Sequence, residues 1–331
     1  MKLHITLDYE LFLDDRVGTV EKSLILPMQA FHDLCKKYKV RATIFVDAAY
    51  LYKLDELRGQ WPQLQVDYEK VTDNLKWLEA EGHDIELHIH PQWYYSTYDA
   101  EGWHLDWEHY KLSSAPYEES AGYLAKSKKL LDEIIGRKTQ IFRAGGYSIQ
   151  QFDYATCFRK QGILADSSVL TKRKNLSATH YYDYSEAPTD AYTFTDDILR
   201  STGDGEFTEF PITCSKFSLP YYIRSKKKSA RMRGTRWGDG GANPKGFLPR
   251  IIGRAEAFLR WSPYHHATID CNTFSMLLDI YQANRGSNKH FVILGHPKGL
   301  STGSLQMLER LILASRTLGD TFTTLKEAIE S

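Results

Sequence analysis

Residues 84–90, Asp84-Ile85-Glu86-Leu87-His88-Ile89-His90, form a short run rich in apolar side chains that ends in two histidines. An amphipathic stretch at 68–81 precedes this run and stops at Gly82, so the pattern predicts a helix followed by a β-strand. Similar strand-like runs lie at 3–7, 41–46, 139–143, 164–169, 207–212 and 290–294, and further helical patterns lie at 20–38, 118–135, 152–161, 273–283 and 305–316. Alternation of this kind favours a parallel sheet covered by helices. We therefore expect an α/β fold, a distorted (β/α)7-type barrel related to the TIM barrel.

Two stretches interrupt the alternation, at about 172–206 and 215–266. We interpret both as long insertions on a single domain that spans 1–331, and long loops inside a compact domain are often functional. The second insertion contains a basic run, made up of Lys226, Lys227, Lys228, Arg231, Arg233 and Arg236. Two interpretations of the run stay open, a solvated loop and a clamp for an anionic group such as a phosphate.

Composition excludes several classes of protein. Lys and Arg together number 42, as do Asp and Glu, so the basic excess of a nucleic-acid-binding protein is missing. No stretch approaches the roughly 20 apolar residues that a membrane span requires. The four cysteines include no C-x-x-C pair, which argues against a zinc ribbon or a redox dithiol. No apolar leader precedes Asp8, and we therefore expect a cytoplasmic location.

Titratable side chains stand at the ends of nearly all the predicted strands. In barrels of this type the carboxyl ends of the strands carry the active site. The residues concerned are Asp8, Glu10, His88, His90, Arg143, Asp166, Glu209 and His296. Alternate positions on a strand face the same way, so Asp8 and Glu10 can share one site, as can His88 and His90. One carboxylate with two imidazoles is a normal ligand set for zinc or a similar divalent ion.

Five segments resemble motifs of the polysaccharide deacetylases, the NodB-homology group also classed as carbohydrate esterase family 4. In order along the chain they are Thr6-Leu7-Asp8-Tyr9-Glu10, Gly82-His83-Asp84-Ile85 followed by His88, Arg143-Ala144-Gly145-Gly146, Asp166-Ser167-Ser168, and Leu294-Gly295-His296. This is the family's own order, and the resemblance covers nearly the whole chain.

The chain also departs from the family pattern. Its two acids are spaced D-x-E rather than adjacent, and Glu10 stands where an aspartate is usual. The family's second histidine falls on Gln92, which leaves His90 as the substitute ligand and Gln92 as the alternative. The tryptophan that often follows the aspartate motif is missing.

The resemblance implies a metal-dependent hydrolase that removes an N-acetyl group from an amino sugar or from a biosynthetic intermediate of a surface glycan. Glu10, His88 and either His90 or Gln92 would hold one divalent metal, with zinc as the expected ion.

The expected catalytic groups are Asp8 as general base and His296 as the acid that protonates the departing amine. Arg143 would orient Asp8, and Asp166 would keep His296 charged.

Three further residues are expected to contact the substrate. A backbone N–H near Gly146 or Tyr147 would stabilise the oxyanion. Trp93 would belong to an aromatic surface that stacks on a sugar.

Three other functions are compatible with these residues. A glycoside hydrolase could use carboxylates such as Asp8 and Glu209, but it would leave the histidines without roles. A non-catalytic sugar-binding module on the same fold would bind glycans without turnover. A hydrolase of a small cyclic amide would use the same residues on another substrate.

Overall fold

Parallel strands form the centre of the protein, of which the computed structural model describes residues 1–243 and 262–331. The strands are β1 (Lys2–Tyr9), β2 (Thr43–Asp47), β3 (Asp84–Ile89), β6 (Ile141–Ala144), β7 (Ala165–Asp166), β11 (Phe207–Glu209) and β14 (His290–Gly295). Their order across the sheet is β11-β7-β6-β3-β2-β1-β14, and every neighbouring pair in this series is parallel.

The sheet curls until its two ends meet. Just beyond β11, Ile212 forms isolated parallel bridges with Leu170 on one side and with Val292 of β14 on the other. The amide of Thr213 donates to the carbonyl of Val292 at 3.2 Å, and the amide of Val292 donates back to Oγ1 of Thr213 at 3.0 Å. These bonds join β14 to the segment after β11, so the two ends of the parallel series are connected. The predicted distorted seven-stranded barrel is therefore confirmed.

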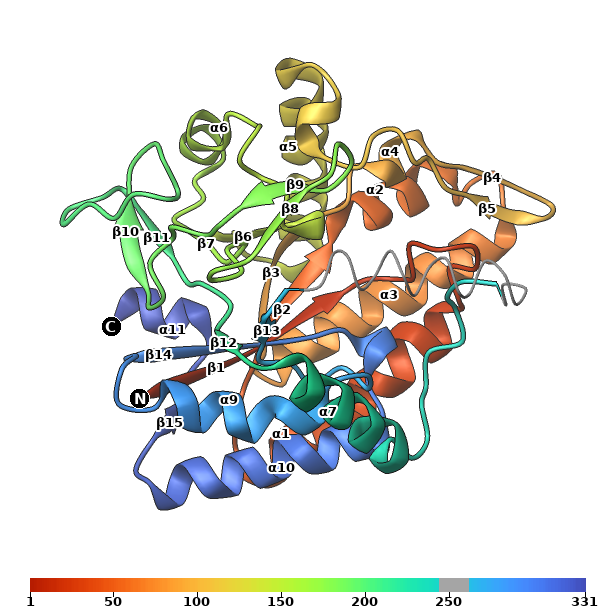
Figure 1. Ribbon diagram of the computed structural model, residues 1–331. Coiled ribbons are helices and arrows are strands. Elements are labelled where there is room, and N and C mark those ends of the chain that lie inside the picture. The colour runs from red at the N-terminus through yellow and green to blue at the C-terminus, as the bar shows by residue number, and fades with distance from the viewer. Residues whose placement is uncertain (244–261) are drawn as a thin grey trace.

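Helices pack around the outside of the strands (Figure 1). They are α1 (Leu26–Tyr38), α2 (Ala48–Leu57), α3 (Pro62–Ala80), α5 (Tyr117–Ile135), α6 (Tyr154–Gln161), α9 (Leu277–Asn284), α10 (Thr302–Thr317) and α11 (Leu325–Glu330). Strand side chains such as Leu3, Ile5, Leu7 and Ile293 are fully buried. Both faces of a parallel sheet are covered, so its strands consist of nearly continuous apolar runs rather than alternating ones.

Two elements differ from the sequence-based expectation. The helix expected at 20–38 begins as a π-helical turn, η1 (Glu21–Ile25), which runs directly into α1. Helix α2 was not predicted, because it follows β2 without a turn and its apolar residues continue the apolar run of the strand. Asp47, the last residue of β2, is also the residue that precedes this helix.

Several short helices and strands lie outside the main elements of the barrel. They are α4 (Gln92–Tyr95), the 3-10 turns η2 (Leu112–Ser114), η3 (Gly145–Tyr147), η4 (Phe274–Met276) and η5 (Pro297–Gly299), and the terminal strand β15 (Thr321–Phe322), which pairs with β1. A hairpin of β4 (Thr97–Asp99) and β5 (Gly102–His104) projects from the barrel as an arm (Figure 1). The first insertion contains the hairpin of β8 (Lys174–Leu176) and β9 (Tyr181–Asp183), and β10 (Tyr192–Phe194), which pairs antiparallel with β11.

The second insertion contains β12 (Cys214–Lys216), α7 (Leu219–Met232) and β13 (Tyr264–His266). The sequence left the basic run open as a solvated loop or an anion clamp, and the structure places Lys226, Lys227, Lys228 and Arg231 in α7 with exposed side chains. Residues 244–261 of this insertion lie outside the described residues. Among the helices of the described ranges, none has the length and apolar character of a membrane span.

Candidate metal centre and active site

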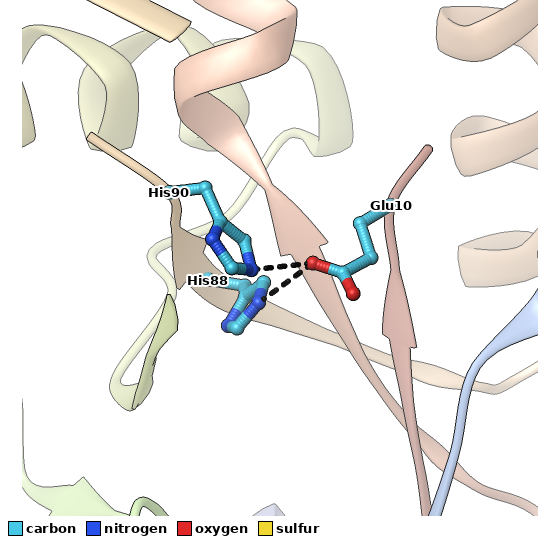
Figure 2. A group of neighbouring side chains, drawn as sticks. All are labelled: Glu10, His88 and His90. Atoms are coloured by element: carbon cyan, nitrogen blue, oxygen red, sulfur yellow. Dashed lines mark hydrogen bonds and ion pairs between the residues drawn. The ribbon is translucent and has the colours of Figure 1, made fainter. Parts of the chain in front are cut away.

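Glu10, His88 and His90 meet at the carboxyl ends of β1 and β3 (Figure 2). Nε2 of His90 lies 2.6 Å from Oε2 of Glu10, and Nε2 of His88 lies 3.3 Å from the same oxygen. One ligand atom from each residue falls within 4.8 Å of the others, and all three side chains are buried. The alternation of side chains along each strand predicted that these three residues share one site, and in the structure they lie together.

The cluster is oriented by its neighbours. Nδ1 of His88 lies 2.8 Å from the carbonyl oxygen of Arg143, which can only accept, so Nδ1 carries the hydrogen and Nε2 presents its lone pair to the cluster. The second oxygen of Glu10 pairs with Nζ of Lys298 at 2.8 Å, and the same ammonium donates to the carbonyl of Leu11 at 2.6 Å. This arrangement leaves one carboxylate oxygen and two imidazole nitrogens facing a common point, as a divalent metal requires.

The charge of the site also fits a cation. Burial alone would raise the pKa of Glu10, but Lys298 first, and then His90 and His88, hold that pKa well below its usual range. Burial would likewise lower the pKa of His88, yet the negative charges of Asp8 and Glu10 raise it. Glu10 is therefore ionised, and its charge together with that of Asp8 favours positive charge at the cluster.

Asp8 is held by Arg143. Nη1 of Arg143 donates to Oδ1 of Asp8 at 2.6 Å, and both side chains are buried. The rest of the guanidinium donates to the carbonyl and to Oγ of Ser167, each at 2.8 Å, and its carbon lies 4.1 Å from the centre of the Phe45 ring. Arg143 is thus fixed on three sides. It orients one oxygen of Asp8 and leaves Oδ2 toward His296, whose Nε2 is 3.6 Å away.

The partner of His296 is Asp270. Oδ2 of Asp270 lies 2.8 Å from Nδ1 of His296, and Oδ1 accepts from the His296 amide at 2.9 Å. Burial alone would lower the pKa of His296, but Asp270, with Asp8 and Glu10, raises it to about 9. His296 is therefore protonated at neutral pH, and its Nε2–H points between Asp8 and Glu10.

The predicted contact of Asp166 with His296 is wrong. Asp166 accepts from the amide and from Oγ of Ser168, at 2.7 and 2.9 Å, and forms a hydrogen bond with Glu209. Burial raises the pKa of Asp166 to about 6 and that of Glu209 well above its usual range, so the two fully buried carboxyls share a proton. Both carboxyls are buried at the strand ends. Glu209 is therefore not accessible as a catalytic carboxylate of the kind that a glycoside hydrolase needs.

The segment after β6 packs tightly against the metal cluster. A Cβ on Gly145 would lie 2.5 Å from the carbonyl of Ile89 and 2.7 Å from Nδ1 of His90, so only glycine permits this approach. Gly146 and Tyr147 both have positive φ, 58° and 62°. For Tyr147 this conformation costs about 1–2 kcal/mol, a strain that clusters at functional sites. Burial first, and then the charge of Asp8, raises the pKa of the Tyr147 hydroxyl well above its usual range, which indicates that the ring lies near the site.

Trp93 does not serve as a sugar-stacking surface. Its side chain is 0% exposed and packs against the rings of Tyr50 and Trp103, with centroids 4.7 and 5.0 Å away. The prediction was wrong because α4 turns this residue inward, behind His90. Gln92, the first residue of α4, is also fully buried, and among the described residues its amide has no hydrogen-bond partner. The cluster of Glu10, His88 and His90 forms without it.

Three residues of the site were not assigned from the sequence, namely Asp47, Asp270 and Lys298. Oδ1 of Asp47 accepts from the His90 amide at 3.2 Å, and Oδ2 is buried without a hydrogen-bond partner in the described part of the chain. Asp47 directly follows the predicted strand 41–46, so the strand-end rule could have found it. Lys298 lies two residues after His296, but nothing in the sequence links its ammonium to Glu10.

Comparisons with known proteins agree with the geometry. Residues 27–153 match the model of a family described as polysaccharide deacetylase, a range that includes His88, His90 and Arg143 but not Asp8 or His296. No curated protein sequence matches the chain. The strands and motifs confirm the family resemblance drawn from the sequence.

Solved structures show a distant likeness. One is a protein from Pseudomonas aeruginosa described as a probable polysaccharide deacetylase, 11% identical, covering 98% of this chain and 88% of that one, with a TM-score of 0.48. Another is an allantoinase, 11% identical, with coverages of 98% and 87% and a TM-score of 0.47. A polysaccharide deacetylase from Bacillus cereus is 11% identical, with coverages of 98% and 91% and a TM-score of 0.44. At such identities no property of those proteins transfers to this one.

Proposed function

We propose that this chain, of which residues 27–153 match the family described as polysaccharide deacetylase, is a metal-dependent hydrolase that removes N-acetyl groups from an amino sugar. The observation that carries the proposal is the buried cluster of Glu10, His88 and His90 next to the two charged pairs, Asp8 with Arg143 and His296 with Asp270. A ligand set, a base and an acid therefore lie around one point.

The metal proposed for this cluster is a single divalent ion, zinc. A divalent metal, when bound, would lower the pKa of a bound water and polarise an amide carbonyl. Glu10, His88 and His90 would hold it, since zinc takes carboxylate oxygen and imidazole nitrogen in sites that keep a position open. Lys298 would keep the second oxygen of Glu10 away from the ion.

The chemistry then needs two proton transfers. Asp8, bound through Oδ1 to Arg143, would take a proton from the attacking water through Oδ2. Water adds to the acetamide carbonyl, and the C–N bond breaks to release acetate. His296, protonated because of Asp270, would give the proton on Nε2 to the departing amine.

The substrate proposed is an N-acetylated sugar within a glycan or a glycan precursor. The cytoplasmic location expected from the sequence stays a prediction, as do the single domain and the substrate roles of Gly146 and Tyr147. The cyclic-amide hydrolase would use the same metal and the same acid–base pair, so the assay must include both substrate types.

The test combines an activity screen with metal analysis. Purified protein is incubated with N-acetylated sugars, sugar nucleotides, lipid-linked sugars and small cyclic amides, and acetate release is measured beside ring opening. We expect acetate release and about one divalent ion per chain by elemental analysis. His88→Ala should lose the ion, whereas His104→Ala, a change at a histidine of the β4–β5 arm, should keep it. Ring opening without acetate release, or a full metal content in His88→Ala, would contradict the proposal.

A further inference from the structure

A cavity of about 650 Å³ lies between α7 and α9 and shares no lining residue with the metal centre. The two helices lie side by side on the outside of the barrel (Figure 1). Cavities of roughly 300–1,000 Å³ are typical of small-ligand sites. The charged residues of its lining are four cations of the second insertion and one acid, namely Arg224, Lys227, Lys228, Arg231 and Asp279. The cavity is therefore strongly positive, although the chain as a whole is neutral.

The four cations of the lining, called the α7 cations below, lie on one face of that helix. Residues three and four apart are neighbours on a helix surface, so Arg224 lies next to Lys227 and Lys228. Arg231 in turn lies next to both lysines. Like charges at this spacing repel each other and destabilise the helix, and a bound anion would offset that repulsion.

The α7 cations have no counterion within the protein. In the described part of the chain none of them forms an ion pair with a carboxylate, although all four are exposed. Asp279 is the one acid of the lining, and it accepts a hydrogen bond from the hydroxyl of Tyr221 instead. Lysines elsewhere do find acids, as Lys37 does with Glu309 at 2.7 Å. Four unpaired positive charges therefore surround one cavity.

The backbone of α7 is fixed from its buried side. The amide of Ser275 donates to Oγ of Ser229 at 3.1 Å, and Oγ of Ser275 donates to the carbonyl of Ser225 at 2.9 Å. Ser225 and Ser229 are 6% and 0% exposed, so the helix lies close against the turn η4. A ligand would not have to order this helix, which lowers the free-energy cost of binding.

We infer that this cavity is an anion-binding site, which takes a small ligand with a diphosphate or a similarly charged phosphate group. Guanidinium groups bind phosphate oxygens through paired hydrogen bonds, and the ammonium groups add positive charge. A free phosphate compound and the headgroup of a phospholipid present this same chemistry. Of the two interpretations that the sequence left open for the basic run, this is the anion clamp, and it does not rest on the proposed function.

The first test is binding of pyrophosphate to the full chain, measured by calorimetry at low ionic strength. The parent should bind it saturably and more tightly than it binds inorganic phosphate, which carries less charge. The melting temperature of the protein should rise with pyrophosphate concentration, because the ligand binds the folded state. Added salt should weaken the binding, since exposed charges are screened.

Three consecutive lysines supply a matched set of variants. Lys227 and Lys228 line the cavity, whereas Lys226 is also exposed on α7 but does not line it. Lys227→Gln and Lys228→Gln should each weaken pyrophosphate binding roughly three- to tenfold, and Arg224→Gln combined with Arg231→Gln should weaken it by at least about tenfold. Lys226→Gln should bind like the parent. Without ligand, Lys228→Gln should melt no lower than the parent, because the change relieves repulsion along the helix.

Three results would overturn the inference. The first is the absence of saturable binding. The second is equal weakening in Lys226→Gln and Lys227→Gln, which would show a diffuse basic surface rather than a site. The third is loss of pyrophosphate binding in His88→Ala, which would place the phosphate at the proposed metal. His88→Ala should instead bind pyrophosphate like the parent, even if no substrate of the chain is deacetylated, so the two proposals fail separately.

Vesicles distinguish the two sources of the phosphate group. The chain is sedimented with phosphatidylcholine vesicles that contain or lack phosphatidic acid. Cosedimentation that needs phosphatidic acid, that pyrophosphate competes away and that the double arginine variant loses would identify a phospholipid headgroup. Pyrophosphate binding without cosedimentation would identify a free phosphate compound. Both outcomes support the site, and the absence of both kinds of binding contradicts it.

Discussion

Replacing Asp270 with Asn should move the pH dependence of the reaction. Asn has the shape of Asp but lacks its charge, and its single acceptor oxygen can replace only one of the two carboxylate oxygens that contact the ring and the amide of His296. Asp270 contributes most among the groups that raise the pKa of His296 to about 9, so the variant should return that pKa to about its ordinary value of 6.5.

The expected magnitude depends on pH. His296 acts as an acid, so only its protonated form is active. The reaction is therefore fast below the pKa of His296 and slows as the pH rises through that pKa. At pH 8 the protonated fraction would fall from about nine-tenths to about 3%, roughly a 30-fold loss, whereas at pH 6 both proteins stay at least about three-quarters protonated. The loss in Asp270→Asn should therefore be large in alkali and small in acid.

The assay is acetate release measured as kcat/KM between pH 5.5 and 10, which reports the pKa of groups in the free enzyme. Asp166→Asn is the comparison variant, because Asp166 contacts Ser168 and Glu209 rather than His296. Its alkaline limb should stay where the parent has it. An unshifted limb in Asp270→Asn, a shifted limb in Asp166→Asn, or an equal loss at every pH would refute the assignment of Asp270.

Three other variants test the remaining parts of the site. Asp8→Asn should keep its metal and lower kcat by roughly two to four orders of magnitude, the range for a lost general base, and a rate near that of the parent would exclude Asp8 from that role. Lys298→Met should weaken metal binding roughly 10- to 100-fold in competition with a chromophoric chelator, because Lys298, at 2.8 Å, makes a closer contact with the second oxygen of Glu10 than His296 does at 3.6 Å, and an unchanged affinity would contradict a positioning role. Trp93→Ala should lower the free energy of unfolding by about 3–5 kcal/mol in urea titration, since the ring is wholly buried; weaker glycan binding at unchanged stability would instead restore the sequence-based interpretation.

Much of the barrel could be predicted from local sequence alone. Seven apolar runs predicted the seven strands, because parallel strands buried on both faces need continuous apolar side chains. Boundaries were harder where no turn separates two elements. Helix α2 begins at the residue after β2, and its apolar positions Ala48, Ala49 and Leu51 are as buried as the strand itself.

The cluster of Glu10, His88 and His90 was also open to prediction. Each residue stands at a strand end, and the two-residue period of a strand fixes which side chains share a face. To bring these residues together, one needs to know in addition only which strands are neighbours, and β1, β2 and β3 are consecutive in the sheet. The same rule, applied once more, would have included Asp47.

The sequence by itself therefore determined the barrel, the strand-end positions and the ligand cluster, because all three follow from periodicity along the chain. Only the tertiary structure decided which carboxylate contacts His296, which tryptophan ring lines a cavity and which cation pairs with Glu10. Asp270 lies in a segment outside the named strands that is bridged to β14 through Thr268 and Leu294, and this crossing leaves no periodic signal in the sequence. Trp93 and Trp103 both follow His90 closely in the sequence, yet Trp93 is buried and Trp103 lines a cavity. Long side chains such as that of Lys298 reach across several residues, so their partners depend on how distant segments pack rather than on spacing along the chain.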